Sequence, residues 1–418
     1  MLAKTLSADQ QTVAEVQLEQ IFGGPIETLI EVRSDKIAPA IGAVLPLKYN
    51  ELTKLIEVNG APIDDSFLQT LYLELAEQFK IKMSAKEAAD GALLVARRNP
   101  YHPVKDYICG LSERLPQKDW DNLAKYFYGI DDDWATLHLQ RQLIACVARA
   151  FNPGCKLDTA FITYGKQGLG KSTQWSILGG EWFSDSLGDL RNIKDDKLCL
   201  HAAWIHEWGE IDSVVGKKES EAVKRFISTE RDLIRRPYGR GMELMERGCA
   251  IVGTTNRDDF IKDHTGNRRY PLVRVEQVNN SWIREHRDAI WGSAYEQMMS
   301  GTRHWYTTEE EERINEDAKG FMAEDPLRDN IEAYFDGFTG QDFTIRQVVH
   351  FCEPDHYKAM STSELRRVCG SYAKVCQSLG AKNTGKRERR HIYEGDTKPQ
   401  SSVWTPPSQA ALSDECPF

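Results

Sequence analysis

Apolar residues recur three and four positions apart through most of residues 47–150, which is the spacing of helices with one buried face. The stretches DSFLQTLYLELAEQF (65–79) and LHLQRQLIACVARAF (137–151) show this spacing most clearly. The pattern predicts an all-helical domain over 47–150. Residues 1–46 have only weak helical periodicity, so we predict an N-terminal arm there.

Three short apolar runs follow, and each ends in glycine or polar residues: LDTAFITYG (157–165), LCLHAAWIH (198–206) and GCAIVGTT (248–255). Runs of this length, separated by helical or irregular segments, are typical of buried strands in a parallel sheet. They predict an α/β core over 151–275.

Helical spacing returns in SWIREHRDAIWGSAYEQMMSG (281–301), which predicts a helical lid over 276–324. Residues 325–396 contain a capped helical stretch, the basic segment KNTGKRERRH (382–391) and a short apolar run. This order predicts a winged-helix-like domain. The Pro- and Ser-rich residues 397–418 are expected to form a disordered tail.

The chain has 418 residues, 41% of them hydrophobic, and a formal net charge of -10. This charge argues against a protein that coats nucleic acid through its bulk charge, but basic patches lie at 217–240 and 382–391. No apolar run is long enough to cross a bilayer and no signal-peptide pattern is visible, so cytoplasmic residence is expected. The nine cysteines include no C-x-x-C pair, and we expect reduced thiols.

The first apolar run leads directly into GKQGLGKS, Gly165–Ser172, which fits G-x-x-x-x-G-K-[ST] at every fixed position. Glycines lack Cβ, so several backbone N–H groups can converge on phosphates at a helix N-terminus, where the helix dipole also favours an anion. We predict an ATP site in which Lys171 neutralises the β- and γ-phosphates and Ser172 offers its hydroxyl to Mg²⁺. The expected nucleotide-binding residues are Gly165, Lys166, Gln167, Gly168, Leu169, Gly170, Lys171, Ser172 and Thr173.

Hydrolysis of a bound nucleotide needs a carboxylate near the metal and the attacking water. The segment AAWIHEWGEID (202–212) offers Glu207 and Glu210 at the end of the second apolar run. We expect Glu210 to orient the water and Glu207 to act at the metal, and the reverse assignment stays open. The third run continues into Asn256, whose amide at a strand tip can hold the water against the γ-phosphate.

The ordered set GKQGLGKST, WIHEWGEID, RRPYGR, GTTN and HTGNRRYP resembles the virulence-associated protein E family of phages and mobile genetic elements. The AAA+ core of that family is similar to superfamily 3 helicases. The resemblance implies an α/β P-loop NTPase with a parallel sheet core and a ring, usually a hexamer, with ATP between neighbouring subunits. By analogy, the helices before the core are expected to form a collar that holds the subunits together.

The resemblance also implies roles for arginines near the third strand. Arg268 and Arg269 match the place of the arginine that reaches into the neighbouring subunit's site, and Arg268 is slightly favoured. The preceding interval, 233–247, matches a β-hairpin in the ring channel, and Arg240 near its tip is the expected contact to single-stranded DNA.

Two more arginines of this interval, Arg235 and Arg236, are expected to contact DNA or to face nucleotide across the subunit interface. In the winged-helix-like domain, Lys386 and Arg387 are the expected DNA contacts.

These patterns favour an ATPase that works as a ring-forming DNA helicase or translocase on single-stranded or forked DNA, in the replication of a phage or mobile element. The alternative is an ATP-gated DNA-binding switch or helicase loader without processive unwinding. A small-molecule kinase ranks low, because it would need neither a trans arginine nor an asparagine-tipped third strand. Residues 1–150 lack the acidic constellation of a primase, so priming would come from a separate protein.

Overall fold

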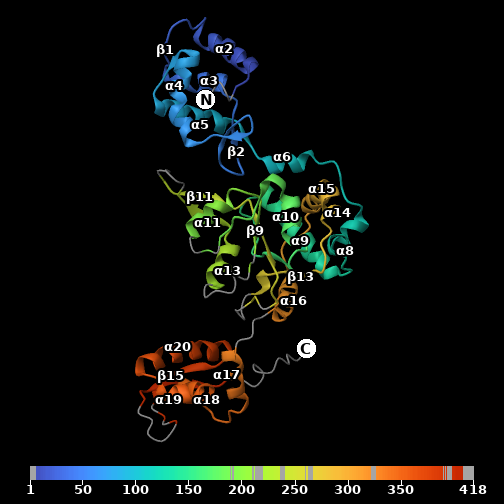
Figure 1. The fold of residues 1–418 in the computed structure, drawn as a ribbon, viewed down its shortest axis with the longest axis vertical. Coiled ribbons are helices and arrows are strands. Elements are labelled where there is room, and N and C mark those ends of the chain that lie inside the picture. Colours follow the sequence, from blue (N-terminus) through green and yellow to red (C-terminus); the bar gives the residue numbers. More distant parts are fainter. Residues whose placement is uncertain are drawn as a thin grey trace. The chain divides into compact units, whose positions relative to one another are not determined.

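The computed structural model describes residues 6–188, 190, 193–209, 211, 220–235, 241–258, 260–261, 267–321, 326–388, 390, 392 and 398–407. The chain divides into two compact units, residues 1–322 and 323–418. Figure 1 labels their helices and strands. Each unit has hydrophobic clusters of its own, and each is described by itself.

The first unit begins with a small subdomain of helices and short strands. Its elements are α2 (Ala8–Phe22), β1 (Ile30–Glu31), α3 (Ser34–Val44), β2 (Leu47–Asn50), β3 (Ile56–Val58), β4 (Ala61–Pro62), α4 (Asp65–Phe79), β5 (Ile81–Lys82), α5 (Ala85–Arg98) and β6 (Pro100–Tyr101). Four of the strands form a sheet in the order β4-β3-β2-β6, and β1 pairs with β5. Capping boxes at Ser7 and Ser84 fix the starts of α2 and α5.

Two sequence predictions are wrong in this subdomain. Residues 6–46 do not form an arm, because Leu18 of α2 and Ile41 of α3 share a buried cluster with Leu71 and Leu75 of α4. The region from residue 47 is not all helical either, because β2 to β6 lie within it. The weak periodicity of α2 has a simple cause, since only two of its 15 residues are buried.

A five-stranded parallel sheet follows in the sequence (Figure 1). Its strands are β7 (Phe161–Tyr164), β8 (Phe183–Ser184), β9 (Ile205–Trp208), β12 (Ala250–Thr255) and β13 (Leu272–Arg274), in the order β13-β7-β12-β9-β8. Every pair in this sheet is parallel, so the carboxyl ends of all five strands meet at one edge. The predicted α/β class with a parallel sheet is therefore confirmed.

The predicted strands at 157–165 and 248–255 correspond to β7 and β12, but the run at 198–206 is only partly a strand. Its first residues end α11 (Ile193–Leu200), and β9 begins at Ile205. Leu200 and Trp204 are both buried. A short apolar run reports burial, and burial alone does not distinguish a helix from a strand.

Helices flank the sheet, and a β-hairpin precedes β12. These elements are α6 (Pro103–Gly110), α7 (Gln117–Trp120), α8 (Leu123–Tyr128), α9 (Asp133–Phe151), α10 (Lys171–Gly179), η1 (Gly180–Trp182), α13 (Ser220–Ser228), β10 (Arg231–Ile234), β11 (Glu243–Glu246), η2 (Asn267–Arg269), α14 (Asn280–Glu285), α15 (Arg287–Met299) and α16 (Thr308–Lys319). The buried helix α9 packs against α15 and against β7, β12 and β13.

The predicted lid, 276–324, is helical, but α15 belongs to the main core. Ile290 and Trp291 have no exposed surface, and the indole Nε1 of Trp291 donates to the carbonyl of Leu178 at 2.9 Å. Because its apolar face is buried so completely, α15 packs against the sheet domain and does not form a lid over it.

The second unit is a smaller α/β body with its own core. Its elements are α17 (Pro326–Asp336), β14 (Phe343–Thr344), α18 (Ile345–Cys352), α19 (Pro354–Ala359), α20 (Thr362–Ser378), β15 (Lys382–Glu388) and β16 (Ser401–Thr405), with strand order β14-β16-β15. The prediction of a disordered tail from residue 397 is wrong for β16, because Val403 and Trp404 are buried and pair with β14. Pro and Ser around this strand concealed its short apolar centre.

Within the described part of the chain, no helix combines the length and apolar character that a bilayer crossing requires. The cysteines within the described part of the chain are free thiols.

Candidate active site

The glycine-rich segment 165–170 connects the end of β7 to the start of α10. Gly168 and Gly170 have φ angles of 85° and 82°, in the left-handed region that glycine adopts without strain. A Cβ on Gly165 would lie 2.4 Å from the carbonyl oxygen of Val275, so only glycine fits there without displacement. Glycine is thus required at three positions of the loop, and α10 begins at Lys171 with its first N–H groups free of intrahelical partners.

A cavity of about 310 Å³ lies over this loop, at the carboxyl edge of the sheet. It is lined by Gln167, Gly168, Gly170, Lys171, Ser172, Thr173, Gly209, Thr254, Thr255 and Asn256. The lining is glycine, hydroxyl, amide and ammonium, which is the donor chemistry that phosphate groups require. Six of the nine predicted nucleotide-binding residues therefore line one cavity.

Lys171 lies at the floor of the cavity and is only 6% exposed. Its Nζ donates to the carbonyl oxygens of Gly165 at 2.7 Å and Lys166 at 2.8 Å, and to Oδ1 of Asn256 at 2.7 Å. Burial lowers the pKa of this ammonium group, and the charge of Glu207 opposes the shift. The contacts bring together the loop and the tip of β12, so Lys171 and Asn256, which the sequence analysis selected separately, lie side by side.

Glu207 is the third residue of β9 and is 1% exposed. Its Oε1 accepts a hydrogen bond of 2.6 Å from the hydroxyl of Thr254 on β12. Thr254 lines the cavity, whereas Glu207 lies behind it. The carboxylate is thus held within the sheet, close enough for its charge to act on Lys171.

The residues present fit Mg²⁺ bound together with a nucleotide. Mg²⁺ usually keeps several waters and takes only one or two protein oxygens beside the phosphates. The exposed hydroxyl of Ser172 lines the cavity and is such an oxygen. No group of three or more His, Cys, Asp or Glu side chains that could hold a metal alone occurs among the described residues.

Arg268 lies in η2 and has two carboxylate partners in its own chain. It donates to Glu311 of α16, and its Nη2 lies 3.7 Å from Oδ2 of Asp158. Arg269, the next residue, donates from Nε to Oγ of Ser228 at 3.0 Å. The structure therefore gives Arg268 an intrachain role as an ion-pair partner.

A β-hairpin formed by β10 and β11 begins at Arg231 and overlaps the interval 233–247, where the resemblance implied one. β10 and β11 pair antiparallel, with Leu233 opposite Leu244 and Asp232 opposite Met245. Asp232 is fully buried and accepts hydrogen bonds from Arg247 at 2.6 and 3.0 Å. This ion pair joins the two strands at the base of the hairpin, and Arg247 also donates to the carbonyl of Phe226 on α13.

Other predicted site residues are placed as follows. Arg235 is exposed directly after β10, and Lys386 and Arg387 are exposed on β15 of the second unit. Glu210, Arg236 and Arg240 lie outside the described residues.

Residues 114–323, half of the chain, match the model of the virulence-associated protein E-like domain. The chain belongs to this family. The matched virulence-associated protein E-like domain contains the glycine-rich loop, the five-stranded sheet, the hairpin and η2. The N-terminal subdomain and nearly all of the second unit lie outside it.

Among solved structures, the apo C-terminal region of NrS-1 (305–718) is 14% identical to this member of the family, with a TM-score of 0.45 over 81% of this chain and 84% of that chain. A second form of that region is 13% identical, with a TM-score of 0.45 over 86% and 96%. The active helicase SCCmec type IV Cch is 11% identical, with a TM-score of 0.30 over 78% and 69%. No curated protein matches the sequence.

Two residues of this virulence-associated protein E-like domain contact the site although sequence reasoning gave them no role. Thr254 is part of the quoted GTTN motif, but only the structure shows that its hydroxyl holds Glu207. Asn280 donates from Nδ2 to the carbonyl oxygen of Gly170 at 3.1 Å. It lies in an unremarkable Asn-Asn pair, and no sequence signal identified it.

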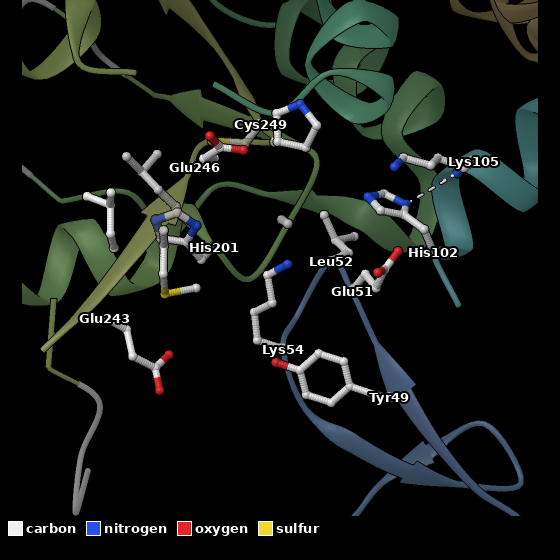
Figure 2. Close-up of a pocket in the computed structure, with 16 residues that line it drawn as sticks. Tyr49, Glu51, Leu52, Lys54, His102, Lys105, His201, Glu243, Glu246 and Cys249 are labelled. Carbon is white, nitrogen blue, oxygen red and sulfur yellow. Dashed lines mark hydrogen bonds between the residues drawn. The ribbon is translucent and has the colours of Figure 1, made fainter. Parts of the chain in front are cut away.

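Figure 2 shows a second cavity of the first unit, about 450 Å³ in volume, beside β11 and the start of α6. None of the predicted site residues lines it. Its charged lining combines Lys54 and Lys105 with Glu51, Glu243 and Glu246. Because both signs are present, its charge favours neither an anion nor a cation.

Proposed function

We propose that this protein is an ATP-driven, ring-forming DNA helicase or translocase that acts in the replication of a phage or mobile genetic element. One observation carries the proposal: Lys171 and Asn256 are bonded to each other in the lining of one cavity at the carboxyl edge of the sheet, and Thr254 of the same lining holds the buried Glu207. Membership in the virulence-associated protein E-like family supports the biological context.

In the proposed site the P-loop binds the phosphates of ATP. The loop amides and the start of α10 would donate to phosphate oxygens, and Lys171 would exchange one of its three present acceptors for a phosphate. The hydroxyl of Ser172 would hold Mg²⁺, with Glu207 behind it, and this ion would neutralise charge that develops on the phosphates. The reacting group is then surrounded by fixed donors.

Hydrolysis also requires an oriented water. Asn256 lies at the end of β12, beside Lys171, and its amide offers both a donor and an acceptor. Glu207 and Glu210 are the two candidate carboxylates for water activation. Glu207 is buried and bonded to Thr254, which favours a role behind the metal. Water activation is then left to Glu210.

DNA is expected to contact the hairpin, through Arg240 and with help from Arg235 and Arg236. Backbone phosphates of single-stranded or forked DNA need positive charge and no base reading, which suits arginines at a hairpin tip. In the proposed ring, which the family resemblance implies to be a hexamer, the hairpins would face the channel. A separate primase would supply primers.

A second candidate function is an ATP-gated DNA-binding switch or helicase loader. The observation that favours it is β15, whose seven residues are all exposed and include Lys382, Lys386 and Arg387. A basic, solvent-facing strand beside α20 can bind DNA without any channel. The switch would couple nucleotide binding to DNA affinity rather than to movement.

The decisive test is ATP hydrolysis by the purified protein with and without single-stranded DNA, beside Lys171→Ala and Arg240→Ala. For a motor, DNA accelerates turnover, Lys171→Ala abolishes it, and Arg240→Ala removes only the acceleration. Arg97→Ala, on α5 of the N-terminal subdomain, is the matched control for loss of an arginine. Nucleotide binding with negligible turnover that ignores DNA would reject the motor and favour the switch.

A further inference from the structure

The phosphate cavity has no surface suited to a nucleobase. Its lining consists of the glycine-rich loop, the first residues of α10 and the polar ends of β9 and β12, without an aromatic or large aliphatic side chain. A nucleobase is a flat ring that needs carbon surface on its faces and hydrogen-bond partners at its edge. Its site must therefore lie beside this cavity.

The segment 274–280, which joins β13 to α14, contacts both ends of the loop. Val275 approaches the position of a Cβ on Gly165, and its N–H donates to the carbonyl of Tyr164 at 2.8 Å. At the other end, the amide of Asn280 donates to Gly170. The segment is thus fixed to the phosphate-binding loop at both of its ends.

A further cavity of about 580 Å³ lies between this segment and the end of α8. It is lined by Tyr128, Gly129, Ile130, Arg274, Glu276 and Gln277. Tyr128 and Ile130 supply carbon surface that is continuous with the main core. The guanidinium group of Arg274 lies over the ring of Tyr164, the last residue of β7, at 5.8 Å from its centroid.

The polar groups of this cavity suit the edge of a base. The amide of Gln277 offers a donor and an acceptor, and Glu276 offers acceptors. A Cβ on Gly129 would lie 2.2 Å from Nε2 of Gln277, so the absence of a side chain at 129 allows the amide to lie across the turn. Gly129 has a φ of 72°, which also favours glycine.

We propose that this cavity binds the nucleobase of the nucleotide whose phosphates occupy the P-loop, with Ile130 against the ring and Gln277 at its edge. The inference rests on the proposed nucleotide binding and adds the part of the site that selects a nucleoside triphosphate over a bare polyphosphate. Asn280 is a positioning residue, because it ties this segment to Gly170.

The test compares the affinities of Mg²⁺-ATP and Mg²⁺-tripolyphosphate by titration calorimetry, for the full chain and four variants. Gln277→Ala and Ile130→Ala are each expected to weaken ATP about fivefold to tenfold, the effect of one lost hydrogen bond or a few lost methyl contacts, and to leave tripolyphosphate unchanged. Lys171→Ala should weaken both ligands. Gln17→Ala, exposed on α2, is the matched control and should weaken neither.

Each other outcome has a distinct meaning. If Gln277→Ala and Ile130→Ala leave ATP unchanged while Lys171→Ala weakens both ligands, the base lies elsewhere and only this inference fails. If they weaken both ligands equally, they act through the loop, and the inference also fails. If the wild-type protein binds neither ligand, the proposed nucleotide binding itself fails.

Discussion

The ammonium group of Lys171 donates a hydrogen bond of 2.7 Å to Oδ1 of Asn256 and so ties the glycine-rich loop to the tip of β12. With the carbonyls of Gly165 and Lys166, it uses all three donors of the lysine. A phosphate that binds Lys171 must replace at least one of these acceptors. The exchange would couple phosphate binding to the position of the Asn256 amide.

Replacement of Asn256 by alanine should separate binding from chemistry. We expect ATP turnover to fall about 100-fold, because a water-positioning group is lost. The affinity for ATP should change less than about threefold, because Lys171 loses a competing acceptor as well as a partner. Equilibrium binding and single-turnover hydrolysis measure the two effects.

The charged variant Asn256→Asp is the informative control. Its carboxylate would hold Lys171 through a charge-assisted bond and would repel phosphates, so ATP affinity should fall about tenfold or more. If Asn256→Ala weakens ATP binding as much as Lys171→Ala does, the hypothesis that Asn256 and phosphate compete for Lys171 is wrong.

The hydroxyl of Thr254 should be required to hold Glu207. Thr254→Val keeps the shape but removes the 2.6 Å hydrogen bond to a carboxylate that is almost fully buried. We expect a loss of about 2 kcal/mol in the free energy of unfolding and a several-fold rise in the Mg²⁺ concentration needed for half-maximal ATPase activity. Thr254→Ser retains the hydroxyl and should restore the Mg²⁺ dependence. A valine variant with wild-type Mg²⁺ dependence would contradict the role of Thr254 at the metal.

The ion pair at the hairpin base should make stability fall in acid. Burial raises the pKa of Asp232, but the nearby His201, the hydrogen bonds from Arg247 and the charges of Arg247 and Lys197 outweigh it and hold the pKa well below its usual value of 3.8. A lowered folded-state pKa stabilises the protein above the unfolded-state pKa, and this contribution is lost as the pH falls below about 4.

Urea unfolding between pH 3 and 7 measures this contribution. Asp232→Asn should cost about 3 kcal/mol at pH 7, because Arg247 stays buried without a counter-charge, and the difference from wild type should shrink as the pH falls below about 4. A difference that is constant across this pH range would show that Asp232 is not the titrating group.

The exposed strand β15 should contribute to DNA binding in a salt-dependent way. The double variant Lys386→Ala and Arg387→Ala should lower DNA affinity uniformly across sequences and reduce the slope of log affinity against log salt by about 2. Lys358→Ala with Lys374→Ala removes the same charge from exposed positions of the second unit and is the control. If both double variants show the same slope of log affinity against log salt, the effect comes from net charge alone and not from the position of β15.

The sequence predicted the parallel sheet and the loop between β7 and α10, but not the domains around them. The P-loop spacing identifies Lys171 because a local backbone shape creates that site, and β7 and Asn256 follow from the strands beside it. The link from Thr254 to Glu207 and the bond from Asn280 to Gly170 depend on which strands and segments become neighbours. Pairing between distant segments leaves no local pattern in a single sequence.

The missed strands of the N-terminal subdomain have a local cause instead. Strands such as β1, β4, β5 and β6 are only two residues long, which is too short for an alternating pattern to appear. The ion pairs of Arg268 were missed for the other reason, which is that partners distant in the sequence leave no local pattern. Its partners Asp158 and Glu311 are 110 and 43 positions away, so its ion pairs were invisible in the sequence.

The adjacent residues Arg268 and Arg269 have different partners within the chain. Arg268 is held by two carboxylates of its own chain, so Arg268→Ala should lower the free energy of unfolding by about 1 kcal/mol, with Glu311→Gln causing a similar loss. Arg269 also has a partner in its own chain, Ser228, so both arginines stay candidates for the trans role in the proposed ring.

Mixing two inactive variants distinguishes the two candidates. Lys171→Ala cannot use its own site but retains both arginines, whereas Arg269→Ala retains its nucleotide site and lacks the trans group. If Arg269 acts in trans, mixed rings contain some complete interfaces, and ATPase activity should recover to a measurable fraction of wild type on mixing. The same mixture with Arg268→Ala tests the neighbouring arginine in the same way. Recovery only with Arg268→Ala would return the trans role to that residue, and recovery with neither, in rings shown to exchange subunits, would contradict an arginine in trans at this position.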